Sequence, residues 1–125
     1  MKPKPSWEGG CGELPAVLQR LLGEYGVDKL LLESMDAVDE PKQGRIRVDY
    51  IFTFLDGEPR TLVLRAHVSR SEPECPSIAG LVPAAAVYEM EIHDLLGVRF
   101  RGNPWLREGF LKPMEMKGTY PLRKG

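Results

Sequence analysis

The amino-acid sequence predicts an α+β domain: an antiparallel sheet of three to four strands, two helices packed on one face, and an irregular, basic C-terminal tail. Three observations predict it. Two neighbouring segments alternate apolar and polar residues, two others carry apolar residues at helical spacing, and periodicity fades after residue 97. At 125 residues the chain has the length of one domain. We divide it into an α+β body, residues 1–97, and an extended docking tail of the same domain, residues 98–125.

The first predicted element is a helix that follows an extended arm. Residues 1–12 are rich in proline and glycine, and we expect them to form this arm. Residues 13–25 should be helical because their apolar side chains fall on one stripe: Leu14, Val17, Leu18, Leu21, Leu22 and Tyr25. Pro15 suits the first helical turn, and Gly26 suits the position just past the helix end.

Three strands are predicted next. Residues 28–35 contain a run of three leucines, and Pro41 and Gly44 break the chain after them. Residues 45–55 alternate, with one apolar face made of Ile46, Val48, Tyr50, Phe52 and Phe54. Residues 60–69 repeat the alternation after a turn signal at residues 56–59, so these last two strands should form a hairpin.

The second helix is predicted from Pro83 to about Leu96, with Gly97 as its stop. Its apolar stripe consists of Ala84, Ala85, Tyr88, Ile92, Leu95 and Leu96. The charge of the segment after it differs from that of the body. Residues 1–96 hold ten Lys/Arg against sixteen Asp/Glu, whereas residues 97–125 hold seven against two. A basic end on an acidic body suggests intramolecular docking or an acidic partner.

Composition limits the classes of function. No apolar run approaches the roughly 20 residues of a membrane-spanning helix, and the segment from Met1 to Pro5 is not followed by the apolar stretch of a secretory signal. We therefore expect a cytoplasmic chain that reaches a membrane only through partners. Cys11 and Cys75 stand alone, without metal-ligand spacing, and the sequence does not support a disulfide between them.

One stretch of the second helix gathers three carboxylates and a histidine. Glu89 and His93 share one side and could bind a metal, but transition metals usually need about three or more protein ligands, and the other histidine, His67, belongs to a strand. Glu91 and Asp94 share another side and could act in acid–base catalysis, yet no nucleophile, phosphate loop or cofactor signature accompanies them. We favour a polar helix face on which Glu91 and Asp94 pair with arginines of the tail: Arg99, Arg101, Arg107 and Arg123.

Two smaller questions concern nucleic acid and His67. The basic tail carries Trp105, Phe110 and Tyr120 as stacking groups, but the body is acidic and no nucleic-acid-binding motif is present. A basic tail with aromatic anchors equally suits a protein–protein interface. For His67 we expect a place on the polar face of its strand, near Asp49.

The second helix and the segment after it resemble the complex I 30-kilodalton subunit family. The family pattern has Glu-Arg-Glu, two residues, an acidic residue, two apolar residues and glycine. This sequence matches it at Glu89, Glu91, Asp94, Leu95, Leu96 and Gly97, and continues the match at Phe100, Gly102, Pro104, Leu106 and Arg107. Residues 76–78, 83–85 and 121–124 are similar as well. Met90, Asn103 and Trp105 depart from the usual Arg, His and acidic residue.

The resemblance implies a scaffold role without a catalytic site or cofactor of its own. Family members sit in a peripheral arm, on the cytoplasmic side of the membrane. They contact a hydrogenase-large-subunit-like subunit and a small iron–sulfur subunit, which would hold the clusters and the nickel–iron or quinone site. The short chain and residues 91–95 look more like relatives from energy-converting hydrogenases and formate hydrogenlyase. Docking should involve Glu89, Glu91, Asp94, Arg101, Trp105, Arg107 and Arg123. The alternative is a small soluble enzyme that uses the Glu89/Glu91/His93/Asp94 cluster.

Overall fold

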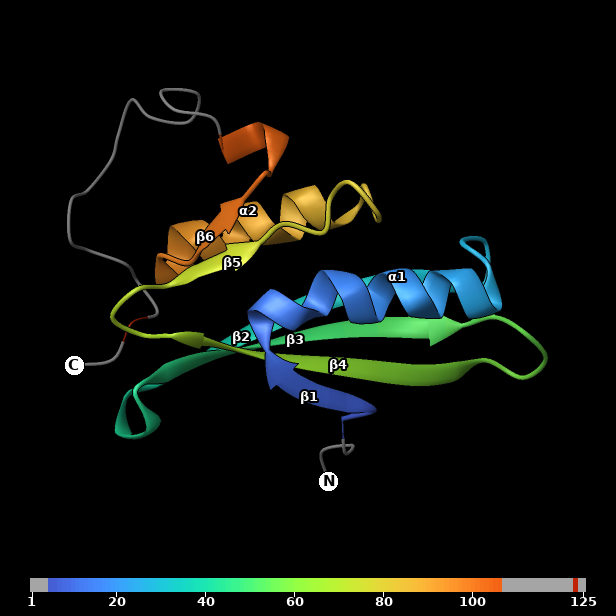
Figure 1. Ribbon diagram of the computed structural model, residues 1–125, viewed down its shortest axis with the longest axis horizontal. Helices are drawn as coiled ribbons and strands as arrows, with labels where there is room; N and C mark the ends of the chain where they lie inside the picture. Colours follow the sequence, from blue (N-terminus) through green and yellow to red (C-terminus); the bar gives the residue numbers. More distant parts are fainter. Residues whose placement is uncertain (1–4, 107–122, 124–125) are drawn as a thin grey trace.

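The computed structural model describes residues 5–106 and residue 123. Its main sheet has the strand order β1-β4-β3-β2, and both helices lie on one face of it (Figure 1). This arrangement confirms the predicted α+β class. The elements are β1 Trp7–Gly10, η1 Cys11–Glu13, α1 Leu14–Tyr25, β2 Leu30–Glu40, η2 Pro41–Gln43, β3 Arg45–Phe54, β4 Arg60–Ser69, β5 Glu74–Pro76, α2 Ala85–Leu96, β6 Arg99–Arg101 and η3 Pro104–Leu106.

The β3–β4 hairpin forms the centre of the sheet, as the alternating sequence predicts. The two strands pair antiparallel from Arg45↔Ser69 to Phe54↔Arg60. The five apolar side chains of β3 that were expected on one face are all buried: Ile46, Val48, Tyr50, Phe52 and Phe54. The opposite face of the hairpin carries the charged side chains. Two-residue periodicity therefore fixes which face receives the helices.

Strand β2 pairs antiparallel with β3 and is longer than the predicted strand, which ended at Met35. It continues to Glu40 because its later acidic residues find cationic partners. The Asp39 side chain is fully buried and lies 2.7 Å from the guanidinium Nε of Arg70. A register shift between Leu32 and Ser34 interrupts the pairing once.

Strand β1 comes from the segment that the sequence suggested as an extended arm. It pairs parallel with β4, from Trp7↔Leu64 to Gly10↔His67, so the four-stranded sheet is mixed. The Trp7 ring folds over Gly9, where a Cβ atom would lie 2.7 Å from the ring. Glycine therefore leaves room for the tryptophan, and the same glycines hide the strand from pattern recognition.

The helices begin and end close to the predicted positions. Leu14, Leu18 and Leu22 of α1 are buried against the sheet. Gly97 ends α2 in the left-handed region at φ 79°, and its N–H donates to the carbonyl oxygen of His93. No helix in the described part of the chain is long and apolar enough to cross a membrane.

A short parallel ribbon, β5–β6, lies beside α2 and was not predicted (Figure 1). Its paired residues Cys75 and Phe100 are both buried. Cys11 is also buried, and both cysteines are free thiols. The hydroxyl oxygen of Tyr50 lies 3.9 Å from the Cys75 sulfur. Burial and the neighbouring Cys11 thiol raise the pKa of Cys75 well above its usual range, the Cys11 contact being the larger cause.

Candidate docking surface around helix α2

Glu89 is the centre of the polar contacts made by α2, although its side chain is fully buried. The Ser77 hydroxyl donates to one carboxylate oxygen at 2.6 Å, and the Ile78 backbone N–H donates to the other at 2.9 Å. The Asn103 amide donates a third hydrogen bond at 2.8 Å. Burial raises the pKa of Glu89, and these three hydrogen bonds oppose that rise only in part. One carboxyl group thus joins α2 to the segments on both sides of it.

Asn103 connects the buried Glu89 to the exposed turn that follows β6. Its amide also donates to the Ala86 carbonyl oxygen at 3.2 Å. Its side-chain oxygen accepts the backbone N–H of Trp105 at 2.7 Å. The Trp105 side chain is 43% exposed, so a large aromatic ring is held at the surface by a turn that is tied to the interior.

The expected polar face of α2 contains Glu91 and Asp94, which are exposed, but not Glu89. A signal for this was present in the sequence. Glu89 lies four residues after Ala85 and three before Ile92, so it falls on the buried stripe of the helix. Its partners Ser77 and Asn103 lie on other segments, and for that reason the helix alone did not reveal them.

The expected pairs between α2 carboxylates and tail arginines are not found among the residues that the structure describes. Arg101 pairs with Glu74 instead. Arg123 donates to two carbonyl oxygens, that of Leu96 at 2.7 Å and that of Arg70 at 3.3 Å. Arg107 lies outside the described residues. Within residues 5–106 and 123, Glu91 and Asp94 therefore have no ion pair.

His93 and His67 each have a local partner. The His93 ring Nδ1 lies 3.0 Å from the carbonyl oxygen of Val98, just past the end of the helix. His67 lies on the polar face of β4, as expected, and its ring Nε2 lies 2.6 Å from a carboxylate oxygen of Glu8 in β1. Across the hairpin it is paired with Arg47, whereas Asp49 is paired with Arg65. In the described part of the chain, no group of three or more His, Cys, Asp or Glu side chains is placed to hold a metal ion.

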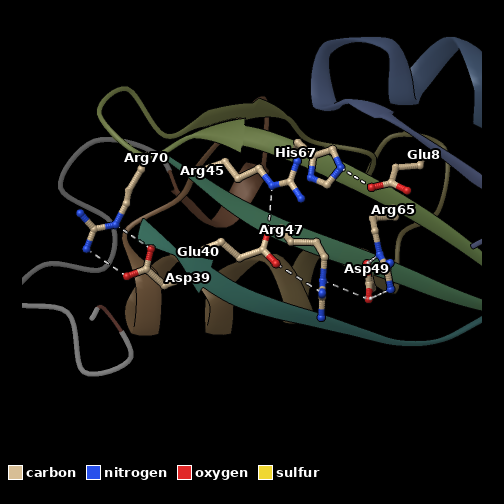
Figure 2. Close-up of polar contacts among 9 residues, drawn as sticks. All are labelled: Glu8, Asp39, Glu40, Arg45, Arg47, Asp49, Arg65, His67 and Arg70. Carbon is tan, nitrogen blue, oxygen red and sulfur yellow. Dashed lines mark hydrogen bonds and ion pairs between the residues drawn. The ribbon is translucent and has the colours of Figure 1, made fainter. Parts of the chain in front are cut away.

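The uncovered face of the sheet carries a chain of alternating charges (Figure 2). Asp49 accepts two hydrogen bonds from the Arg65 guanidinium, at 2.8 and 3.2 Å. Arg47 lies between Asp49 and Glu40, and Arg45 donates to Glu40 at 2.7 Å. The Arg45 contact lowers the pKa of Glu40, and the Asp49 contact raises the pKa of Arg65. These carboxylates and guanidiniums largely neutralise one another.

The sequence matches the family model described as respiratory-chain NADH dehydrogenase, 30 Kd subunit, over residues 12–125. It is 37% identical to a subunit of the NADH-quinone oxidoreductase of Moorella thermoacetica, over 90% of this chain and 72% of that protein. It is 33% identical to a subunit of the F(420)H(2) dehydrogenase of Methanosarcina mazei, over 86% of this chain and 66% of that protein.

A solved structure extends the likeness to the fold. The chain superposes with a TM-score of 0.75 on a chain of the membrane-bound sulfane sulfur reductase, an archaeal respiratory membrane complex. The alignment covers 98% of this chain and 73% of that one at 22% sequence identity. The two chains therefore share a fold.

Proposed function

This chain belongs to the respiratory-chain NADH dehydrogenase 30 kDa subunit family, and we propose that it is a non-catalytic scaffold subunit of a complex I-like membrane-bound oxidoreductase. It occupies the peripheral arm on the cytoplasmic side and docks on a hydrogenase-large-subunit-like subunit, next to a small iron–sulfur subunit. The complex is of the energy-converting hydrogenase or NADH:quinone oxidoreductase type. Iron–sulfur clusters and a nickel–iron or quinone site belong to the partners, and this chain binds no cofactor.

The observation that carries this proposal is the way Trp105 is presented. Large aromatic side chains dominate the binding energy of many protein interfaces when they enter a pocket of the partner. Trp105 is 43% exposed, yet its backbone is held by Asn103, which is bonded to the buried Glu89. A backbone that is held in place before binding loses little conformational freedom when a partner covers the ring.

Exposed charged residues of α2 and β6 fit the rim of such an interface. Glu91, Asp94 and Arg101 are exposed on α2 and β6. Arg107 and Arg123 complete the set of docking residues that we assign, and Glu89 acts on the interface through Asn103. The rim of a protein interface is usually polar, whereas its centre is enriched in aromatic residues.

The enzyme alternative has weaker support from the geometry. Acid–base or metal chemistry by Glu89, Glu91, His93 and Asp94 would require a group that can reach a substrate. Both carboxylate oxygens of Glu89 are engaged in the interior, and the His93 ring is bonded at the end of its helix. The exposed pair Glu91 and Asp94 has no further catalytic partner among the described residues.

The test is the replacement Trp105→Ala in the tagged full-length chain, expressed together with the other subunits of its complex. We expect a loss of about 2 kcal/mol or more in binding, and therefore roughly 30-fold weaker retention of the large subunit. Leu55→Ala is the matched control, because Leu55 is equally exposed, at 44%, but lies at the far hairpin end. Equal retention of the large subunit by both variants would contradict the assigned surface. If the parent chain itself retained no large subunit, the scaffold role would be contradicted.

A further inference from the structure

The outer edge of β2 is the longest open strand edge in the described part of the molecule. β2 ends the strand order β1-β4-β3-β2 and runs for 11 residues, whereas the opposite edge strand, β1, has four (Figure 1). Among the described residues, no segment other than β3 pairs its backbone with β2. A long open edge is a ready template for another strand, and proteins usually protect it with lysine, proline or a covering element.

β2 has a single bulge and neither lysine nor proline, and its charged side chains are all carboxylates: Glu33, Asp36, Asp39 and Glu40. Such carboxylates repel a second copy of the same acidic strand but attract a segment of opposite charge. Helix α2 covers part of its length, and the Tyr88 hydroxyl donates to the Glu33 carbonyl oxygen at 2.9 Å, next to the register shift. That contact occupies one backbone acceptor, and from Ser34 to Val38 no described residue hydrogen-bonds to the outer edge of the strand.

A groove of about 580 Å³ follows this stretch of the edge. One wall is the α2 surface that carries Tyr88, Ile92 and Leu95. The strand itself contributes Met35 to Val38, and the groove continues around the edge to the charged face of the sheet. Apolar side chains beside an open backbone edge offer what an added strand needs, namely main-chain hydrogen bonds and pockets for alternate side chains.

The charges of the groove select the chemistry of the occupant. Both arginines that line it, Arg47 and Arg65, are already paired with Asp49 (Figure 2). The other two charged side chains of its lining are Asp36 and Glu91, and neither has an ion pair among the described residues. The groove therefore presents uncompensated negative charge, and a cationic segment would complement it.

We propose that the β2 edge binds an extended, lysine- or arginine-bearing segment of a neighbouring subunit, which adds to the sheet as a fifth strand. The inference rests on the proposed function in one respect, that the chain is part of a complex. It concerns a contact separate from Trp105, and it assigns the occupant by backbone pairing and charge.

Hydrogen exchange followed by mass spectrometry tests the backbone pairing. The amides of β2 from Ser34 to Val38 are compared in the full-length chain alone and in the purified complex. We expect these amides to exchange about tenfold more slowly in the complex, because an added strand protects the groups on the open edge. The turn at residues 56–59 is the internal reference. Equal exchange in the two states would overturn the proposal, and slow exchange in the isolated chain would show that the edge is covered by this chain itself.

Charge reversal tests the chemistry of the occupant. The variant Asp36→Lys should lower recovery of the complex about tenfold, and its matched control is Asp56→Lys, which changes the same net charge in an exposed turn. Far-ultraviolet circular dichroism of both chains checks that they fold. A loss that is equal in both variants, or absent from both, overturns the basic occupant. If the parent chain is recovered in no complex, the proposed function is contradicted. If the parent chain is recovered in a complex but hydrogen exchange in β2 does not change, only this inference is contradicted.

Discussion

The helix-covered side of the sheet and its open side each hold a carboxylate with little access to water, and the two carboxylates differ in the partners that stabilise them. On the helix-covered side, Glu89 is surrounded by neutral donors from Ser77, Ile78 and Asn103. On the open side, Asp49 is bound to arginine guanidiniums at a side-chain exposure of 13%. The pKa of Glu89 is raised, because neutral donors compensate only part of its burial. The pKa of Glu40, which is bound to Arg45 on the open side, is lowered.

The difference shows how location decides what a charge contributes. Among the described residues no cation contacts Glu89, so its contribution lies in the three segments that it connects. The Arg45–Glu40 pair of the open face, whose side chains are 37% and 20% exposed, stays partly in contact with water, where an ion pair is worth only about 0–1 kcal/mol. The covered face should therefore determine most of the stability of the chain, and exposed polar contacts of the open face should tolerate substitution.

The largest expected effect comes from the apolar layer of the covered face. Phe52→Ala removes a ring that is 1% exposed, and we expect the free energy of unfolding to fall by about 3–5 kcal/mol. Its neighbour Thr53 points to the open face and donates to Glu33 at 2.8 Å in an exposed hydrogen bond. Thr53→Ala should cost about 0.5–1.5 kcal/mol. Chemical denaturation of the purified chains measures both, and similar losses would contradict the division between the faces.

The next effect separates Glu89 from its neighbour on the same helix. Glu89→Leu introduces an apolar side chain of similar size and leaves the donors of Ile78 and Asn103 without the carboxylate acceptor. We expect a loss of about 1–3 kcal/mol in unfolding free energy. The exposed Glu91→Leu should stay within about 0.5 kcal/mol of the parent. The same denaturation assay compares them, and a harmless Glu89→Leu would show that the buried carboxylate organises nothing.

These results show where sequence was sufficient and where it was not. β3 and β4 were predicted to within a residue because alternation is a local property of a half-buried strand. α1 was predicted equally well, because its apolar side chains form a continuous stripe along the helix. β1 was not, because its pairing with β4 joins residues 7–10 to residues 64–67, and two glycines remove its pattern. A non-local partner leaves no local signal.

The candidate docking surface could likewise be predicted only in part. The basic tail suggested Trp105 as an aromatic anchor, and the family resemblance suggested the α2 carboxylates, but neither distinguished Glu89 from Glu91 and Asp94. That distinction depends on Ser77 and Asn103, which reach Glu89 from 12 and 14 residues away. Charge counting favoured pairs between α2 and the tail, whereas Arg101 found Glu74, a nearer carboxylate on the adjacent strand. Sequence indicates which charges are present, and packing decides which of them meet.

The smallest expected effect, and the most specific, is an opposite pH dependence of two glutamates. The folded-state pKa of Glu89 is raised, so its contribution to stability is fully present below the ordinary glutamate pKa of about 4.3 and is lost as pH rises through the folded value. The folded-state pKa of Glu40 is lowered, so its contribution is present above the ordinary value and is lost as pH falls through the folded value.

Glu89→Gln and Glu40→Gln remove one titration each and therefore isolate these two slopes. Unfolding free energies of the parent and both variants are measured by denaturant titration from about pH 3, below the ordinary glutamate pKa, to neutral pH. The advantage of the parent over Glu89→Gln should shrink as pH rises above the ordinary value, because only the parent must keep a buried charge. Its advantage over Glu40→Gln should grow as pH rises toward the ordinary value and then level off, because ionisation strengthens the contact with Arg45. Two slopes of the same sign would mean that water reaches both carboxylates alike, and the contrast between the faces would then be one of packing alone.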